Sequence, residues 1–181
     1  MELEQLIKGC IRQNRKAQEE LYHRYKNILF VLCLKYCRNE AEAEDNLHNA
    51  FIDIFTKIEQ YKGNGSFEGW MKRIAINKAI DSYKKTIHML PVYDDLLHDV
   101  DVTESEIDLP LDYLLSIIQE LPNQYRLVFC LYELDEYSHK EIGEMLHITE
   151  STSKSNLHKA KAILKNKIKS VPSPKSIRNG A

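Results

Sequence analysis

Residues 138–165, "SHKEIGEMLHITESTSKSNLHKAKAILK", carry the clearest structural pattern in the C-terminal part of the chain. Ser138 followed by Glu141 is a capping-box pattern, which starts a helix. Apolar residues then recur at helical spacing, and Gly143 is small enough for two helices to approach closely. His147 and Ile148 fit a tight turn, after which a new helix begins. A helix, a short turn and a second helix predict a helix-turn-helix unit.

The second helix of this unit, Ser151 to Lys169, is strongly basic. It holds six lysines and no Asp or Glu, although the whole chain has a net charge of −2. In a helix-turn-helix the second helix enters the DNA major groove, where lysines release counterions from phosphates. Asn, Ser and Thr near its start can bond to base edges or phosphates. A solvated amphipathic helix is the alternative, but solvent-exposed faces usually mix charges of both signs.

Acidic residues are concentrated in a segment that precedes this C-terminal unit. Residues 91–108 hold seven Asp and Glu and no Lys or Arg, and the segment opens with Pro91. High charge and few apolar side chains predict a flexible linker. Without these seven acids the rest of the 181-residue chain has a net charge of +5.

Upstream of the linker, apolar residues repeat every three or four positions and no stretch alternates as a strand would. This predicts an all-α bundle over residues 1–88, interrupted by the Gly/Asn/Ser loop "YKGNGSF" at 61–67. Residues 70–85 carry a net charge of +4 with aromatic side chains between the cations, a pattern that suits single-stranded nucleic acid. Trp70 begins an apolar face, so we expect it in the core.

Several functional classes lack a motif in this sequence. No apolar run approaches the ~18 residues of a membrane span, and the N-terminus is unlike a signal peptide, so we expect a cytoplasmic protein without membrane insertion. Cys33 and Cys37 are four apart and could form a metal pair, although buried free thiols are the favoured interpretation. Because no nucleotide-binding loop, metal motif or nucleophile signature is found, we expect no catalytic centre, no cofactor and no metal.

Three segments, "AEAEDNLHNAFIDIFTKI" (41–58), "GSFEGWMKRIAINKAIDSYKK" (65–85) and "LPNQYRLVFCLYELDEYSHKEIGEMLHITESTSKSNLHKAKAIL" (121–164), resemble RNA polymerase sigma factors. The resemblance is to the extracytoplasmic-function (ECF) group of the sigma-70 family. It implies an all-α protein of two small helical domains: a region 2 bundle at 1–88 and a region 4 helix-turn-helix domain at 110–170. An acidic linker at 89–109 would join them, and a disordered tail would follow at 171–181.

The resemblance also implies partners and site residues. Core RNA polymerase would bind through its β′ clamp helices, for which the matching positions are Asp45, Asn49 and Asp53, and through its β flap. The −10 promoter element would be opened and held by Lys62, Gly63, Asn64, Gly65, Ser66, Phe67, Arg73, Asn77, Lys78, Asp81, Lys84 and Lys85. The −35 element would be bound by Ser151, Thr152, Ser153, Lys154, Ser155, Asn156, His158, Lys159 and Lys161. An anti-sigma factor is a further partner that family members often have.

The start of the basic helix departs from the family pattern. Ser153 stands where an apolar residue is usual, so packing there should be looser, and Asn156 stands where arginine is usual. Two other functions stay open at this point. One is a helix-turn-helix regulator that binds DNA without polymerase, and the other is an interaction protein whose basic faces are only solvated.

Overall fold

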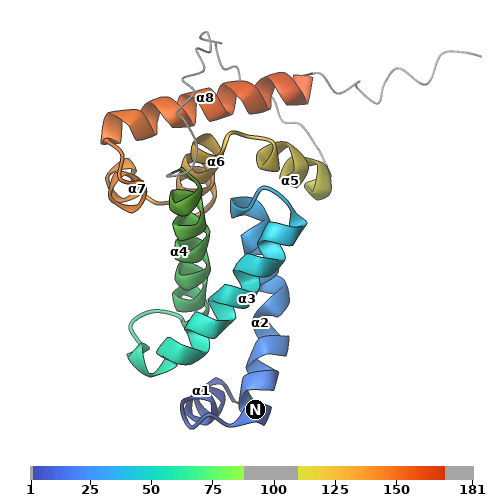
Figure 1. Cartoon of the computed structure of the whole chain (residues 1–181), viewed down its shortest axis with the longest axis vertical. Helices are drawn as coiled ribbons and strands as arrows, with labels where there is room; N and C mark the ends of the chain where they lie inside the picture. The colour runs from blue at the N-terminus through green and yellow to red at the C-terminus, as the bar shows by residue number, and fades with distance from the viewer. Residues whose placement is uncertain (1, 88–109, 170–181) are drawn as a thin grey trace, which may run out of the picture. The chain divides into compact units, whose positions relative to one another are not determined.

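A computed structural model describes residues 2–87 and 110–169, coloured along the chain in Figure 1. The chain divides into two compact units, residues 1–91 and 92–181, which we call unit 1 and unit 2. All regular elements in the described ranges are helical, which confirms the all-α prediction. The predicted linker at 89–109 and the predicted tail at 171–181 lie outside the described residues.

Unit 1 contains five helical elements: α1 (Leu3–Ile11), α2 (Arg15–Tyr36), α3 (Glu40–Lys57), the 3₁₀ turn η1 (Ile58–Gln60) and α4 (Phe67–Ile87). Two of the helices begin at asparagine caps. Asn14 accepts a hydrogen bond from the Ala17 backbone N–H, and Asn39 accepts one from that of Glu42. Such caps satisfy backbone donors that have no partner inside the helix.

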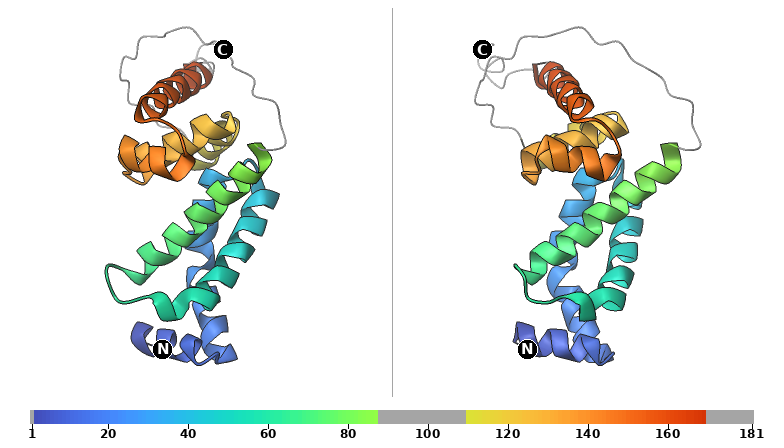
Figure 2. Two further views of the ribbon diagram at one scale, coloured as in Figure 1. Left: turned by 60° about the vertical axis from the view of Figure 1, so that its left-hand side comes forward. Right: turned by 90° about the vertical axis from the view of Figure 1, so that its left-hand side faces the viewer.

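The core of unit 1 lies between α2, α3 and α4, which pack against one another and lie side by side in both views of Figure 2. Leu21, Leu29, Ile54 and Met71 are fully buried there. An aromatic cluster covers the start of α4, where the rings of Phe67 and Trp70 stack with centroids 5.5 Å apart. The expectation that Trp70 packs rather than stands free is therefore met in part, since its side chain is half-buried.

Unit 2 contains α5 (Leu111–Gln119), α6 (Asn123–Phe129), the π-helical turn η2 (Cys130–Leu134), α7 (His139–Leu146) and α8 (Glu150–Lys169). Arg126 on α6 is buried and joins the first two of these helices. Its guanidinium donates to the carbonyl oxygens of Gln119 and Leu121, both at 3.2 Å, and to Asn123 Oδ1 at 2.9 Å. The charge thus caps the C-terminal end of α5, where carbonyl groups lack helical partners.

The predicted helix-turn-helix is formed by α7 and α8. The capping box at Ser138 and Glu141 is present, with both reciprocal hydrogen bonds. His147 ends α7 in the left-handed conformation, with φ of 57°. A Cβ atom on Gly143 would lie 2.8 Å from the carbonyl oxygen of Ile148, so the turn folds back onto α7 only because this residue is glycine.

All four cysteines are buried, and none forms a disulfide. Over the described ranges, no group of three or more His, Cys, Asp or Glu side chains is placed to hold a metal ion. Cys33 instead accepts a hydrogen bond from the Asn46 amide, which places it in the packed interior of unit 1.

Candidate nucleic-acid interface

The outer face of α8 presents small polar side chains at its start and cations further along. Thr149 caps the helix, because its Oγ1 accepts from the Thr152 backbone N–H at 3.0 Å. The predicted −35 residues that are exposed on this face are Ser151, Thr152, Lys154, Ser155 and His158, while Lys159 and Lys161 are half-buried. The first two turns of α8 therefore form a polar surface that a major groove could accept.

Two predicted DNA contacts lie on the inner face of α8 instead. Ser153 is 0% exposed and Asn156 is 5% exposed. Ser153 Oγ lies 2.9 Å from His139 Nδ1, so the serine bonds across to α7. Neither side chain can reach a base edge from this position. We therefore correct the prediction and remove both from the proposed interface.

His139 was missed by the sequence reasoning, because it lies on α7 rather than on the basic helix. Its ring stacks on Tyr132 with centroids 4.3 Å apart and an interplanar angle of 17°. Burial lowers the pKa of His139, and the nearby Lys154 ammonium lowers it further against a smaller opposing effect of Glu150. The neutral imidazole therefore supports the first turn of α8. The unusual polar residue at 153 was the one sequence signal for such a partner.

The lysines of α8 are not unopposed. Lys154 pairs with Glu150 at 2.9 Å on the same helix, and Lys161 pairs with Glu133 of η2 at 2.6 Å. Lys167 pairs with Glu120 at the end of α5. Lys159 lies 5.8 Å from the centroid of the Tyr125 ring. Because exposed ion pairs contribute only about 0–1 kcal/mol, phosphate can displace these acids, but DNA binding must first break the pairs.

In unit 1, a stripe of exposed polar side chains follows one face of α4. Its members are four residues apart: Arg73, Asn77, Asp81 and Lys85. We call these four residues the α4 stripe. Lys84, next to the stripe, is half-buried. Its spacing puts one member on each successive turn, so a strand of DNA running along the helix could meet all four.

The loop before α4 is open and exposed. Lys62, Gly63, Asn64, Gly65 and Ser66 are all exposed, and both glycines have positive φ angles, 76° and 85°. Ser66 caps α4, since its Oγ accepts from the Gly69 backbone N–H at 3.0 Å. Tyr61 holds the other side of the loop by donating its hydroxyl to the Gly65 carbonyl at 2.8 Å.

Phe67, predicted as part of this −10 loop, is a core residue. It is 2% exposed and contacts the rings of Tyr25, Tyr61 and Trp70. A ring enclosed in this way cannot stack on a DNA base, so we correct the prediction for Phe67. The aromatic cluster instead packs beneath the start of α4, and its member Tyr61 holds the exposed loop through the Gly65 carbonyl.

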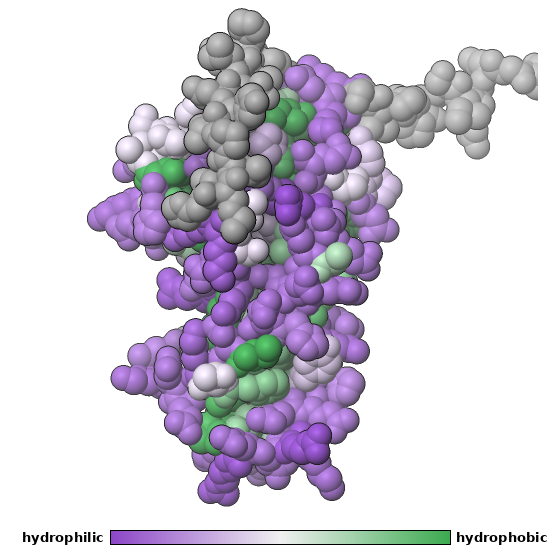
Figure 3. Space-filling model, in the orientation of Figure 1, coloured by the Kyte–Doolittle hydropathy of each residue, from purple (hydrophilic) through white to green (hydrophobic). Residues whose placement is uncertain are grey.

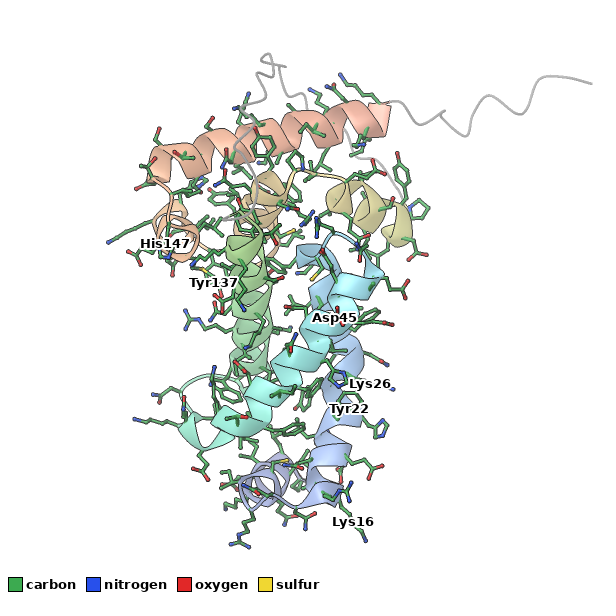
Figure 4. All side chains as sticks on the ribbon, in the orientation of Figure 1. Lys16, Tyr22, Lys26, Asp45, Tyr137 and His147 are labelled. Carbon is green, nitrogen blue, oxygen red and sulfur yellow. The ribbon has the colours of Figure 1, made fainter. Side chains whose placement is uncertain are left out.

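The three predicted polymerase contacts on α3 fall into two environments. Asp45 and Asn49 are exposed, and Asp45 is labelled on α3 in Figure 4. Asp53 is only 19% exposed, because its carboxylate pairs with Lys57 at 2.6 Å and with Lys78 of α4 at 3.0 Å. Burial alone would raise the pKa of Asp53, but the hydrogen bonds from both lysines hold it below its ordinary value. Asp53 and Lys78 therefore join α3 to α4.

An exposed apolar side chain on α3 was also missed. Ile52 is 57% exposed, more than any other large apolar residue described in unit 1. Figure 3 shows apolar side chains reaching the surface in the lower part of this view, where α1 and the end of α3 lie. Ile52 lies three positions after Asn49 and seven after Asp45, so the three residues share one exposed face of α3.

Comparison with known proteins matches the two units to two separate family profiles. A family profile for sigma-70 region 2 matches residues 21–86, and one for sigma-70 region 4 matches residues 111–164. Together the two matches cover most of the chain. The chain belongs to the sigma-70 family of RNA polymerase sigma factors, in its extracytoplasmic-function group.

Individual relatives match over nearly the full length. The ECF sigma factor SigW of Bacillus subtilis is 29% identical over 188 residues, covering 92% of this chain and 99% of the relative. The ECF sigma-E factor of Haemophilus influenzae is 26% identical over 178 residues, covering 90% of this chain and 93% of the relative.

Among solved structures, the sigma factor RpoE from Bartonella quintana, in complex with the anti-sigma factor NepR, has a similar fold. Its TM-score is 0.54 with 14% sequence identity, over 85% of this chain and 98% of that one. Within residues 2–87 and 110–169, no helix is long and apolar enough to cross a membrane.

Proposed function

We propose that this sigma factor recruits core RNA polymerase to promoters by holding the −10 element on unit 1 and the −35 element on unit 2. One observation carries this proposal: each matched region presents its own exposed polar face, the α4 stripe with its loop in region 2 and the head of α8 in region 4. Catalysis is left to the core enzyme, and this chain supplies promoter specificity.

In unit 1, melted −10 DNA runs along the α4 stripe. Arg73 and Lys85 attract its phosphates, Asn77 offers an amide to a base or phosphate, and the loop at 62–66 receives an unstacked base. Two features support the loop's role. Space is open around both of its glycines, since a Cβ atom at Gly63 or Gly65 would meet nothing within 4 Å. The capped start of α4 fixes the place where the loop ends.

In unit 2, α8 enters the major groove of the −35 duplex with its exposed head. Ser151, Thr152, Ser155 and His158 approach base edges and phosphates, and Lys154, Lys159 and Lys161 contact phosphate after leaving their acidic or aromatic partners. Since none of these cations is arginine, base readout by a bidentate fork is absent from the described part of α8.

The polymerase side of unit 1 is the exposed face of α3. Asp45 and Asn49 supply polar contacts to the β′ clamp helices. The exposed Ile52 supplies apolar contact area to the same helices. Asp53 acts mainly within the protein, through its pairs with Lys57 and Lys78. An anti-sigma protein, the kind of partner present in the RpoE structure, is a natural regulator of the same surfaces.

In vitro transcription with core polymerase over a library of genomic fragments tests this proposal. We expect start sites that depend on the added chain and that share a −10 and a −35 sequence. Co-purification with core polymerase distinguishes this function from that of a helix-turn-helix regulator acting alone. A chain that shifts duplex DNA but neither binds core polymerase nor starts transcripts would contradict the proposal.

A further inference from the structure

A buried side-chain amide lies in the described interior of unit 1, between its three long helices. Asn46 on α3 is 7% exposed, and its Nδ2 group donates to the Ala75 carbonyl of α4 at 3.0 Å. The same amide nitrogen lies 3.3 Å from Cys33 Sγ of α2. One amide thus bridges α2, α3 and α4, and we call it the Asn46 bridge.

Four alanines lie close in sequence to the two helix positions that the Asn46 bridge joins, and larger buried side chains such as Ile54 and Met71 lie further along the same helices. Ala43 and Ala50, one turn to either side on α3, are 0% exposed, and Ala75 and Ala79 on α4 are 1% and 6% exposed. Alanine faces let two helices approach closely but offer little shape to fix how far one slides along the other. A hydrogen bond does fix it, because a buried amide without a partner is strongly unfavourable.

The acceptor of this bond belongs to the helix that carries the α4 stripe. Ala75 lies midway between Arg73 and Asn77, which point outward. A shift of α4 by one turn would move these two side chains by about 5.4 Å. The donor belongs to the helix whose exposed face carries Asp45 and Asn49. The Asn46 bridge therefore fixes the DNA-facing helix against the polymerase-facing helix.

We infer that Asn46 is a positioning residue, which sets the register of α4 for promoter opening rather than adding to the stability of the fold. The partly buried pair of Asp53 with Lys78 joins the same two helices, but the long lysine side chain tolerates displacement that a short buried amide does not. A buried polar residue that selects one helix register is known physical behaviour in coiled coils. The inference rests on the proposed function of unit 1.

Replacing Asn46 by leucine separates the two roles. Leucine has a similar size and suits an apolar interior, and Ala75 keeps its helical hydrogen bond, so we expect an Asn46→Leu protein with an unchanged or higher melting temperature. Its open-complex yield on a promoter with core polymerase should nevertheless fall by on the order of tenfold, less than the roughly hundredfold loss that a 1 Å misplacement can cause. Binding to the isolated −35 duplex should not change.

A measurement on the free protein makes the outcome independent of transcription. Amide hydrogen exchange should become faster in peptides from α4 and stay unchanged in peptides from α2. Asn46→Ala, which continues the alanine face, replaces the leucine variant in these measurements if the leucine variant does not fold. Cys33→Ser keeps an acceptor and should behave as the wild type. Ile58→Val, in the core at η1, is the control for a general loss of packing.

The outcomes are distinct. If exchange in α4 and open-complex yield both match the wild type, or if yield falls only as far as in Ile58→Val, Asn46 does not position α4. If exchange changes as expected but the wild-type chain itself starts no transcripts, the register role stands and the proposed function fails.

Discussion

At the scale of the residue, the position of a side chain around the helix axis, more than its polarity, determines whether it is buried or exposed. Leu157, Ala160 and Leu164 mark the inner face of α8, and a step of four back along the helix from the first two reaches Ser153 and Asn156. Both are polar, which suggested a DNA contact, yet both are buried. Among the described residues the Asn156 amide nitrogen has no hydrogen-bond partner, whereas Ser153 has one in His139.

The His139 contact predicts a pH dependence of unit 2. The pKa of His139 is lowered in the folded protein, so the neutral ring is favoured there, while in the unfolded chain the ring takes up a proton near its ordinary value of 6.5. The stabilisation is complete above pH 6.5 and is lost as the pH falls through the folded pKa. Melting of unit 2, followed by circular dichroism, should occur a few degrees lower at pH 5.5 than at pH 7.5.

Two variants identify the group responsible. His139→Phe keeps a ring against Tyr132 but cannot titrate, so the fall in melting temperature between the two pH values should shrink. His158→Gln changes an exposed histidine of the same unit and should leave that fall in place. A pH dependence that is equal in both variants would assign the effect to other groups.

Gly143 gives a second prediction at this scale. A methyl group there would lie 2.8 Å from the Ile148 backbone oxygen, which a flexible side chain cannot relieve by moving. Gly143→Ala should therefore destabilise unit 2 by about 1–3 kcal/mol, as overpacking commonly does. Chemical denaturation measures the change, and Glu144→Ala at the next, exposed position should lie within about 0.5 kcal/mol of the wild type.

At the scale of the element, the basic helix α8 is balanced by acids from other parts of the fold. The sequence shows six lysines and no acid between residues 151 and 169, but not that Glu133 and Glu120 are brought to two of them. Such pairs join residues that are far apart in the chain, so no local sequence pattern predicts them. The helix is consequently less available to phosphate than its composition suggests.

Two substitutions of opposite effect test this balance in −35 duplex binding. Replacing Lys154, Lys159 and Lys161 together by alanine should weaken binding and reduce the slope of log K against log salt by up to about 2.7, or 0.9 for each phosphate contact. Glu133→Gln should strengthen binding, because it releases Lys161. Fluorescence anisotropy across a salt series measures both, and an unchanged slope in the triple variant would show that these lysines do not touch phosphate.

At the scale of the whole molecule, the order of the elements was predictable and the facing of single side chains was not. The turn at 61–67, the capping box at Ser138 and the glycine at 143 each act through local backbone chemistry, so they could be recognised from sequence. Phe67 was misassigned because a ring next to an exposed loop can turn either way. Only the surrounding rings of Tyr25, Tyr61 and Trp70 decide its direction.

The acidic segment joins the two units in the sequence and so concerns the whole molecule. Residues 91–108 carry seven acids and no cation, and we propose that they imitate nucleic acid in a basic channel of the polymerase. Replacing the seven acids by Ser and Gln at constant length should lower the yield of open complexes on promoter DNA, measured by permanganate reactivity. A shuffled segment that keeps all seven acids is the matched control, and equal yields from all three proteins would contradict the proposed role.

The burial of every thiol gives the protein an internal reporter of its own opening. Cys10, Cys33 and Cys37 lie inside unit 1 and Cys130 lies inside unit 2. A thiol reagent can label each one only while its surroundings are open, so the labelling rate of each measures the free energy of that local opening. Peptide mapping after labelling would therefore show, in the unmodified chain, which unit a bound polymerase, promoter or inhibitor makes more rigid.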